Sequence, residues 1–206
     1  MKEVKKYTLE IWAPMACFTR PEMKVERVSY EVITPSAARA VFEAVFWKPQ
    51  LRWRVVRIEV LCPIAFMHLR RNEVASMVSI KKPYILASNY RQQRSSLVLR
   101  NVRYRITAEM EVHTERLRTD ETHEKYHAMF LRRASRGQCF VQPYLGCREF
   151  SADWRLVGVE EPCTPIKESK DLGIMLYDID FTNVLSPTPI FYRAVMNDGI
   201  IHVPRL

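Results

Sequence analysis

Glycine is scarce in this chain. The 206 residues contain only five glycines, at positions 137, 146, 158, 173 and 199. They never cluster, so neither the G-x-G-x-x-G motif of dinucleotide-binding proteins nor the G-x-x-x-x-G-K-[ST] loop occurs. Both motifs need glycine because the backbone must approach phosphate groups closely. The sequence therefore excludes a nucleotide-phosphate cradle of either kind.

Long apolar runs and paired cysteines are also lacking. The amino terminus, MKEVKKYTLEIW, has a charged start and then alternates polar with apolar residues, unlike a signal peptide or a membrane span. The cysteines are odd in number and widely separated, unlike a disulfide framework. They are Cys17, Cys62, Cys139, Cys147 and Cys163. We expect a cytoplasmic protein with reduced thiols and no membrane span.

Acidic residues are the minority among the charged ones. The chain has 23 Asp and Glu against 32 Lys and Arg, which gives a net charge of +9. Such an excess attracts polyanions through long-range attraction and counterion release. Nucleic acid is therefore the first partner class to consider, and an anionic membrane the second. With 48% hydrophobic residues, the chain can bury one core, or one core plus a small appended domain.

Three segments in the first 150 residues have the periodicity of strands. They are Lys5–Ala13, Val55–Leu61 and 102–112. The last is the clearest, because apolar residues alternate strictly with polar ones such as Arg103 and Arg105. One face of this strand is expected to be buried.

Two helices are expected between these strands. The first covers Ser36–Lys48, with Thr34 or Ser36 as its N-cap and Pro49 as its stop. The second runs from about residue 120 to 136, and a glycine follows it. The resulting β-α-β-β-α-β order predicts an α+β fold whose N-terminal domain, residues 1–150, is ferredoxin-like (RRM-like).

The sequence beyond Phe150 predicts strands and no helix. The expected segments are Trp154–Val159, Leu172–Phe181 and Ile190–Val203, the last with the hairpin turn signal MNDGII. Residues 151–206 are therefore predicted to form a small antiparallel β domain. In the first domain, Lys81–Ser96 has the composition of a basic connecting loop that can contact a phosphate backbone.

One basic segment combines histidines, a lysine and cysteines: HEKYHAMFLRRASRGQCFVQPYLGCREF, from His123 to Phe150. A zinc site would use His123, His127, Cys139 and Cys147, since histidines four residues apart share a helix face. Structural zinc usually takes cysteines separated by two to four residues, whereas seven separate these two. We therefore expect no metal, and burial of both cysteines as small apolar residues.

The same segment has the residue types needed for metal-free RNA cleavage. In that reaction the substrate supplies the attacking 2'-hydroxyl, and the protein positions it, moves protons and stabilises the phosphorane. A histidine can transfer the protons and a lysine can neutralise the charge. The alternative is a solvated basic helix whose arginines Arg132, Arg133 and Arg136 are surface charges rather than phosphate contacts.

Five long stretches, in order along the chain, resemble the CRISPR-associated RAMP proteins of type I-C systems (Dvulg subtype), which are crRNA-processing endoribonucleases. These stretches are FTRPEMKVERVSYEVITPSAARAVFEAVFWKP, RRNEV, RQQRSSLVLRNVRY, GQCFVQPYLGCREF and LGIMLYDIDF. The resemblance implies a ferredoxin-like domain, a small β-rich C-terminal domain, no cofactor and no membrane partner. It also implies metal-independent cleavage of precursor crRNA at its repeat hairpin, leaving a 2',3'-cyclic phosphate. The product would stay bound with the other subunits of the type I-C interference complex.

The catalytic pattern of the family is matched in part. Related enzymes combine a tyrosine at the end of the first helix with K-H-x-x-M-F, and the matching positions here are Phe46, Lys125 and Tyr126. We predict that Lys125 stabilises charge on the phosphate, that His127 transfers protons, and that Tyr126 orients the RNA. Phe46 would be a wall of the site. In a regular helix, Lys125 and His127 point about 200° apart, so their convergence requires an irregular first turn.

These departures leave a second hypothesis open. The chain could be a non-catalytic or weakly catalytic scaffold subunit of the same complex, which binds crRNA or double-stranded DNA. Under either hypothesis, basic residues on segments flanking the sheet are predicted to bind the RNA phosphates, although several could be plain surface charges. These residues are Arg20, Lys24, Arg27, Arg70, Arg71, Arg94 and Arg103.

Overall fold

The computed structural model describes residues 5–23, 25–81, 83–117, 121–158 and 161–206. Its α-helices and strands, in chain order, are β1 (Lys6–Ala16), α1 (Pro35–Val45), β2 (Leu51–Val60), β3 (Phe66–Val74), β4 (Arg91–Val112), α2 (His123–Ala134), β5 (Asp153–Leu156), β6 (Lys170–Asp180), β7 (Thr188–Met196) and β8 (Ile200–His202). Strand pairing is antiparallel throughout these elements, which confirms the α+β class.

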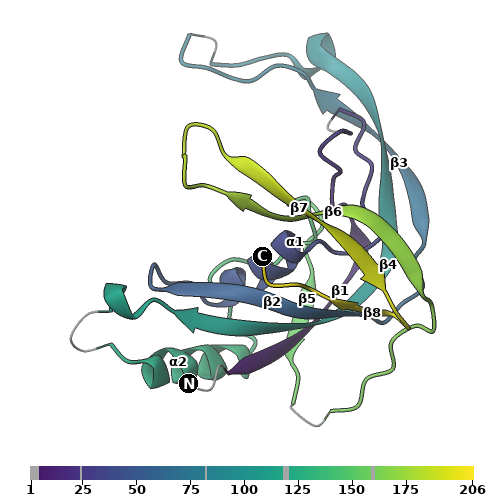
Figure 1. The fold of residues 1–206 in the computed structure, drawn as a ribbon. Coiled ribbons are helices and arrows are strands. Elements are labelled where there is room, and N and C mark those ends of the chain that lie inside the picture. Colours follow the sequence, from purple (N-terminus) through teal and green to yellow (C-terminus); the bar gives the residue numbers. More distant parts are fainter. Residues whose placement is uncertain (1–4, 24, 82, 118–120, 159–160) are drawn as a thin grey trace.

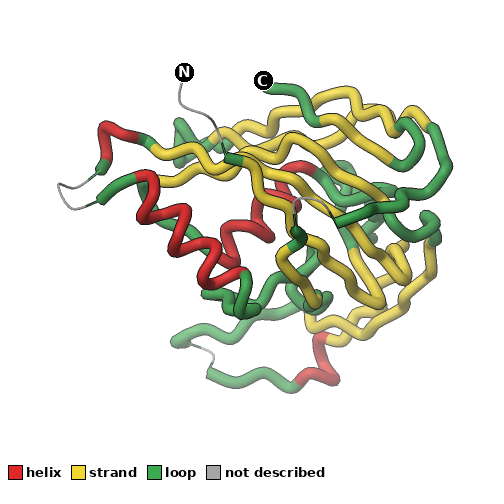
Figure 2. Tube along the Cα trace, turned by 90° about the horizontal axis from the view of Figure 1, so that it is seen from below, coloured by secondary structure: helices red, strands yellow, loops and turns green. Residues whose placement is uncertain are grey.

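A six-stranded sheet forms the centre of the fold. Its order is β5-β1-β4-β2-β8, and β3 pairs with the outer part of β4. The alternation predicted for residues 102–112 is confirmed, since Tyr104, Ile106 and Ala108 are buried on one face. A bulge between Val55 and Arg57 shifts the register of β2, so the apolar residues keep facing the core after it. Both helices lie against this apolar face (Figure 2).

Both helices begin at a threonine cap. Thr34, and not Ser36, caps α1, because its side chain accepts a hydrogen bond from the backbone N–H of Ala37 at 3.2 Å. The helix ends before the predicted Pro49, since Phe46 is already extended and its carbonyl accepts the Trp53 indole N–H at 2.8 Å. Thr122 caps α2 in the same way. The start predicted at residue 120 lies outside the described residues.

The prediction that Lys81–Ser96 is a connecting loop is wrong for its last six residues. Residues 91–96 belong to β4, which is 22 residues long, and they pair with β3. Arg71 lies opposite Arg94 in this ladder. The segment has polar side chains on both faces, so no hydrophobic alternation marks it, and main-chain hydrogen bonds hold it. In Figure 1 the paired β3 and β4 rise away from the rest of the sheet.

The residues after 150 contribute to both sheets. β6 and β7 pair with each other and pack on α1, where Arg39 donates to Asp178 at 2.8 Å. The predicted hairpin turn is confirmed, because Asp198 and Gly199 both have positive φ, as a two-residue turn requires. β5 and β8, in contrast, extend the larger sheet by pairing with β1 and β2. The domain boundary near residue 150 stays a prediction.

Candidate functional site

The three predicted catalytic residues lie on the first turn of α2 and face different directions. α2 is regular α-helix from His123 onward, so no irregular turn brings Lys125 and His127 together. Lys125 is exposed. Tyr126 and His127 are 1% and 8% exposed and belong to the layer between α2 and the sheet. Of the three, only Lys125 stands on the surface in this conformation.

Tyr126 packs against the residue that replaces the family tyrosine. The ring centroids of Tyr126 and Phe46 are 6.3 Å apart, and both side chains are fully buried. The Arg133 guanidinium lies 5.5 Å from the centroid of the Phe46 ring. Phe46 is therefore a core aromatic that one arginine covers. Contact of Tyr126 with RNA, and Phe46 as a wall of the site, stay predictions.

His127 forms a hydrogen bond with a tyrosine that the sequence did not single out. Its Nδ1 lies 2.5 Å from the Tyr7 hydroxyl on β1. Burial raises the pKa of Tyr7 to about 12, so this hydroxyl stays protonated; it donates to Nδ1 or accepts from Nδ1–H according to the tautomer of the ring. Burial, followed by the positive charges of Lys5 and His123, lowers the pKa of His127. The imidazole is therefore neutral near pH 7.

A weak signal for Tyr7 was present in the sequence. Tyr7 occupies a core-facing position of the predicted first strand, together with Leu9 and Ile11. A polar tip on such a face requires a hydrogen-bond partner. The partner lies 120 residues away along the chain. Strand periodicity alone could not identify it.

The residues considered for zinc do not form a metal site. In the described part of the chain, no group of three or more His, Cys, Asp or Glu side chains could hold a metal ion. The five cysteines are free thiols. Cys147 instead lies beside Cys17, and both sulfurs are within 3.9 Å of the Thr19 hydroxyl. The expected burial of Cys139 and Cys147 is partial, because both are of intermediate exposure.

Most of the predicted RNA-binding residues lie near the β3–β4 hairpin. The carboxylate of Glu149 connects two of them, since it accepts hydrogen bonds from Arg27 at 3.4 Å and from Arg71 at 2.5 Å. Arg70 is exposed on β3, and Arg94 on β4 donates to Gln92 at 2.7 Å. Four of the predicted arginines therefore lie on or beside this hairpin.

The other described residues predicted to bind RNA, Arg20 and Arg103, contact an aromatic ring and a carboxylate, respectively. Arg20 covers the Tyr30 ring, with 4.6 Å from its guanidinium carbon to the ring centroid. Lys24 lies outside the described residues. Arg103 is on the sheet face turned away from the helices, where its Nε donates to Glu10 at 2.7 Å. Binding of RNA by these residues stays a prediction.

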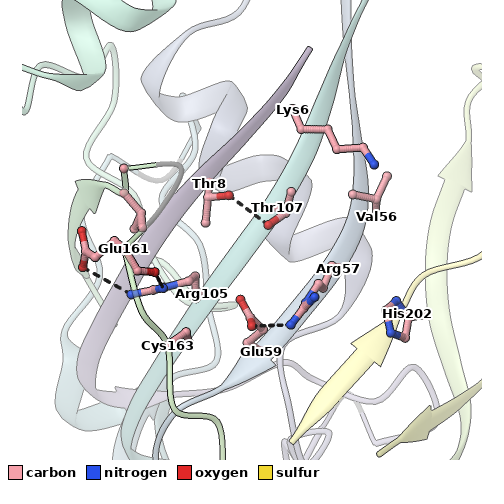
Figure 3. A pocket seen from close by; sticks show the side chains of 12 residues that line it. Lys6, Thr8, Val56, Arg57, Glu59, Arg105, Thr107, Glu161, Cys163 and His202 are labelled. Carbon is pink, nitrogen blue, oxygen red and sulfur yellow. Dashed lines mark hydrogen bonds and ion pairs between the residues drawn. The ribbon is translucent and has the colours of Figure 1, made fainter. Parts of the chain in front are cut away.

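The sheet face turned away from the helices holds a polar cavity of about 450 Å³ (Figure 3). Thr8 and Thr107 share a hydrogen bond of 3.0 Å across the strands at its floor. Arg105 reaches the backbone carbonyl of Glu161 at 2.9 Å and the Glu10 carboxylate at 3.1 Å. We call this surface the open sheet face. Its arginines are largely neutralised by neighbouring carboxylates.

No described helix has the length and apolar character needed to cross a membrane. The chain is similar in sequence and in fold to known proteins. The family model described as CRISPR-associated protein (Cas_Cas5) matches residues 7–204. This match covers nearly the whole chain, so the class is that of CRISPR-associated proteins. Within that class, the chain belongs to the Cas5d family, which confirms the resemblance found in the sequence.

Two relatives have the same name, "CRISPR pre-crRNA endoribonuclease Cas5d". The one from Mannheimia succiniciproducens is 46% identical, over 95% of this chain and 93% of the relative. The one from Thermus thermophilus is 39% identical, over 95% of this chain and 90% of the relative. A solved structure described as a CRISPR-associated protein has a TM-score of 0.74 at 21% identity, over 98% of this chain and 93% of that one. This last likeness shows the fold.

Proposed function

We propose that the chain is a cytoplasmic endoribonuclease that cleaves precursor crRNA at the repeat hairpin. The observation that carries the proposal is the 46% identity to a pre-crRNA endoribonuclease over nearly the full length of both chains. The net charge of +9 supports a polyanionic substrate. After cleavage, the crRNA would remain bound, together with other subunits of a type I-C interference complex.

We also infer a ferredoxin-like arrangement for the part of the sheet that carries α1 and α2. The order β5-β1-β4-β2 supports this inference, with α1 between β1 and β2 in the chain and α2 between β4 and β5. This arrangement places both helices on one face. The family tyrosine position, Phe46, and the lysine of α2 therefore lie at neighbouring helix ends.

In the proposed mechanism, cleavage needs no metal. The 2'-hydroxyl of the nucleotide before the scissile bond attacks phosphorus, the 5'-oxygen of the next nucleotide leaves, and the product ends in a 2',3'-cyclic phosphate. Lys125 stabilises the charge that develops on the phosphorane oxygens. His127 transfers the proton: in the tautomer whose Nδ1–H donates to the Tyr7 hydroxyl oxygen, Nε2 is free to accept the proton of the 2'-hydroxyl and to pass a proton to the leaving 5'-oxygen. Its 8% exposure requires that bound RNA draws the first turn of α2 outward.

Incubation of the purified protein with the repeat RNA of its own host, in EDTA, tests the proposal. We expect cleavage at a single position, a cyclic phosphate on the upstream product, and no cleavage when the scissile nucleotide is 2'-deoxy. Strict dependence on magnesium would contradict the mechanism, as would undiminished cleavage of the deoxy substrate.

Lys125→Ala is the sharpest test of the proposed site. Removal of a charge-stabilising group typically costs about a hundredfold to a thousandfold in rate. We expect a loss of this size in single-turnover cleavage, with the repeat still bound. Lys167→Ala, at an exposed lysine on the loop before β6, is the matched control and should cleave normally. If Lys125→Ala cleaved at the wild-type rate, Lys125 would have no part in the reaction.

The roles of His127 and Tyr126 are separated by single substitutions. We expect His127→Ala to lower the cleavage rate about a hundredfold. Tyr7→Phe should keep the packing and shift the pH dependence of the rate, because the hydrogen-bond partner of Nδ1 is lost. Tyr126→Phe tests the predicted RNA contact by its effect on affinity. A wild-type pH profile for Tyr7→Phe would remove the tyrosine from the mechanism.

The burial of Tyr126 and His127 favours a second candidate function, a scaffold that binds crRNA or double-stranded DNA and cleaves weakly or not at all. In this case the wild type binds its repeat but does not cleave it. Phe46→Tyr combined with Tyr126→His, which restores the family pattern, would then restore cleavage. Cleavage by the wild type excludes this alternative.

A further inference from the structure

Two cysteines that are 130 positions apart in the sequence meet beside the end of β1. Cys17 directly follows β1, and Cys147 lies in residues 141–150, which we call the Cys147 loop. The Cys147 Sγ is 3.6 Å from the Cys17 carbonyl oxygen. The Thr19 hydroxyl oxygen is 3.7 Å from the Cys17 sulfur and 3.9 Å from the Cys147 sulfur. The proposed RNA cleavage uses none of these three side chains.

The backbone holds the two cysteines next to each other. The Cys17 N–H donates to the Leu145 carbonyl at 3.1 Å, and within the loop the Leu145 N–H donates to the Phe150 carbonyl at 2.9 Å. Gly146 lies so close to Cys17 that an added Cβ would be 1.9 Å from the Cys17 carbonyl oxygen. These contacts fix Cys147 beside Cys17. Such proximity is the first requirement for a disulfide, because its Cα atoms must be about 4.4–6.8 Å apart.

The two thiols differ in acidity. A hydrogen bond from the Cys17 thiol outweighs the effect of burial and, with the Thr19 hydroxyl and the charge of Arg27, lowers the pKa of Cys147 to about 6. The same interaction raises the pKa of Cys17, and burial raises it further. Near pH 7, Cys147 is therefore a thiolate and Cys17 a thiol that donates to it. The thiolate is the form of cysteine that acts as a nucleophile.

One member of the pair is within reach of solvent. Cys147 is partly exposed, whereas Cys17 is 1% exposed. A cavity of about 320 Å³, large enough for hydrogen peroxide, borders Cys17, Thr19 and Gly146. Redox-sensing cysteines have this arrangement, in which an accessible thiolate of low pKa lies next to a second cysteine that resolves its oxidised form.

We propose that Cys17 and Cys147 form a reversible disulfide when the protein meets a peroxide. The Cys147 thiolate attacks one oxygen of hydrogen peroxide, the O–O bond breaks, and the hydroxide that leaves takes a proton from the solvent. Cys147 is then a sulfenic acid. The Cys17 sulfur attacks the Cys147 sulfur, the S–O bond breaks, and the Cys17 proton leaves with the hydroxide as water.

The reaction balances without a further reactant. Two thiols and one hydrogen peroxide give one disulfide and two waters, so the two sulfurs are oxidised and the two peroxide oxygens are reduced. Two molecules of a small thiol such as glutathione reverse the reaction and become the oxidised, disulfide form. A disulfide of this transient kind is the kind that occurs in a reducing compartment.

The disulfide fastens the base of the β3–β4 hairpin. The two cysteines belong to a small apolar cluster whose other members come from this hairpin and from the Cys147 loop: Met67, Leu69, Val98 and Phe150. Glu149, two positions after Cys147, also accepts a hydrogen bond from Arg71 of β3. Cross-linking residues so far apart restricts the unfolded chain, so we expect the midpoint of thermal unfolding to rise by roughly 5–15 °C.

Peptide mapping after peroxide treatment tests the proposal. The reduced full-length chain is exposed to a stoichiometric amount of hydrogen peroxide near pH 7, the remaining thiols are blocked with N-ethylmaleimide, and the peptides are identified by mass. We expect a Cys17–Cys147 cross-link with the loss of two hydrogens, which glutathione reverses. The blocking group should be on the other three cysteines: Cys62, Cys139 and Cys163.

Single substitutions separate the roles of the two thiols. In Cys17→Ala, Cys147 should stop at the sulfenic acid, which dimedone traps, and peroxide should no longer raise the unfolding midpoint. In Cys147→Ala, Cys17 should keep its thiol. Cys163→Ala is the matched control, because Cys163 is also partly exposed but burial raises its pKa. This variant should form the cross-link at the wild-type rate.

The wild type alone can overturn the proposal, so the test does not depend on the folding of any variant. Oxidation of Cys147 to the sulfinic acid without a cross-link would overturn it, as would oxidation of Cys163 at the same rate as Cys147. A cross-link that left the unfolding midpoint unchanged would overturn the restraint on the hairpin. RNA takes no part in these measurements, so their outcome is independent of the proposed function.

Discussion

The open sheet face and the Cys147 loop both carry arginine, but only the loop leaves one unpaired. On the open sheet face, the Glu10 carboxylate accepts hydrogen bonds from Arg103, Arg105 and Arg155. In the Cys147 loop, Arg148 is exposed and forms no ion pair within the described ranges. The number of arginines on a surface is therefore a poor guide to nucleic-acid binding. What matters is how many of them the protein has already neutralised.

The pKa of Glu10 shows how strongly the arginines of the open sheet face are paired with a carboxylate. The side chain of Glu10 is 2% exposed, and its burial alone would raise the pKa of the carboxyl. Hydrogen bonds from Arg103 and Arg105 outweigh this effect and hold the pKa below its usual value. Glu10 is therefore a structural anion that fixes three neighbouring strands.

The largest expected effect follows from breaking this pairing. Glu10→Gln leaves three arginines around a neutral amide, and loss of one partner of a buried pair costs roughly 3–5 kcal/mol. We expect a free energy of unfolding in urea that is lower by this amount, with unchanged RNA affinity of the folded protein. Glu22→Gln, at a side chain that is 62% exposed, should stay within about 0.5 kcal/mol of wild type. If folded Glu10→Gln bound RNA more weakly than wild type, the open sheet face would also contribute to RNA binding.

The next largest effect is expected at the support of the Cys147 loop. Gly146 has φ of +85°, and a Cβ there would overlap the Cys17 carbonyl. Gly146→Ala should therefore destabilise the fold by roughly 1–3 kcal/mol, and slow formation of the Cys17–Cys147 disulfide because Cys147 moves away from Cys17. Gly158→Ala is the control, since nothing lies within 4 Å of its Cβ position. Thermal unfolding that is equal for both variants would show that the close approach is not needed.

A smaller effect separates the two kinds of arginine. Arg148→Ala should weaken RNA binding several-fold and reduce the slope of log affinity against log salt by about one. Arg155→Ala should leave that slope unchanged, because Glu10 and Glu161 already neutralise Arg155. Titrations at several salt concentrations make the measurement. Equal slopes for the two variants would remove the distinction between the regions.

The smallest effect is a pH dependence of stability from His127. Its pKa in the folded protein is below the ordinary value of 6.5, mainly through burial, so the unfolded chain takes up the proton first. Stability is therefore complete above about pH 6.5 and decreases as the pH falls from there toward the folded pKa. His127→Gln should lose less stability than wild type between pH 7.5 and pH 5. Identical urea midpoints across this range would contradict the assignment.

Local patterns in the sequence predicted much of the fold. Strict alternation identified the core half of β4, and the Asp198–Gly199 turn followed from residues that tolerate positive φ. A cap at Thr34 or Ser36 marked the start of α1, and a following glycine marked the end of α2. These features depend on neighbours a few residues apart, so periodicity and capping rules detect them. The family was also evident from long stretches of sequence that resemble it and follow one another in the same order along the chain.

The sequence missed features that depend on partners far apart in the chain. The hairpin half of β4 is polar on both faces, so only its pairing with β3 identifies it as a strand. The Tyr7–His127 hydrogen bond joins β1 to α2, and Glu149 reaches back to Arg71. None of these contacts leaves a periodic signal, because a hydrogen bond or ion pair needs only two side chains.

The sequence by itself determined the charge, the α+β class, the family and the lysine on α2. Only the tertiary structure decided which side chains of that helix are buried, which arginines are neutralised, and that Cys17 and Cys147 lie together. The physical reason is that charge and periodicity are properties of the chain. Exposure and pairing, in contrast, depend on which surfaces meet when the chain closes on itself.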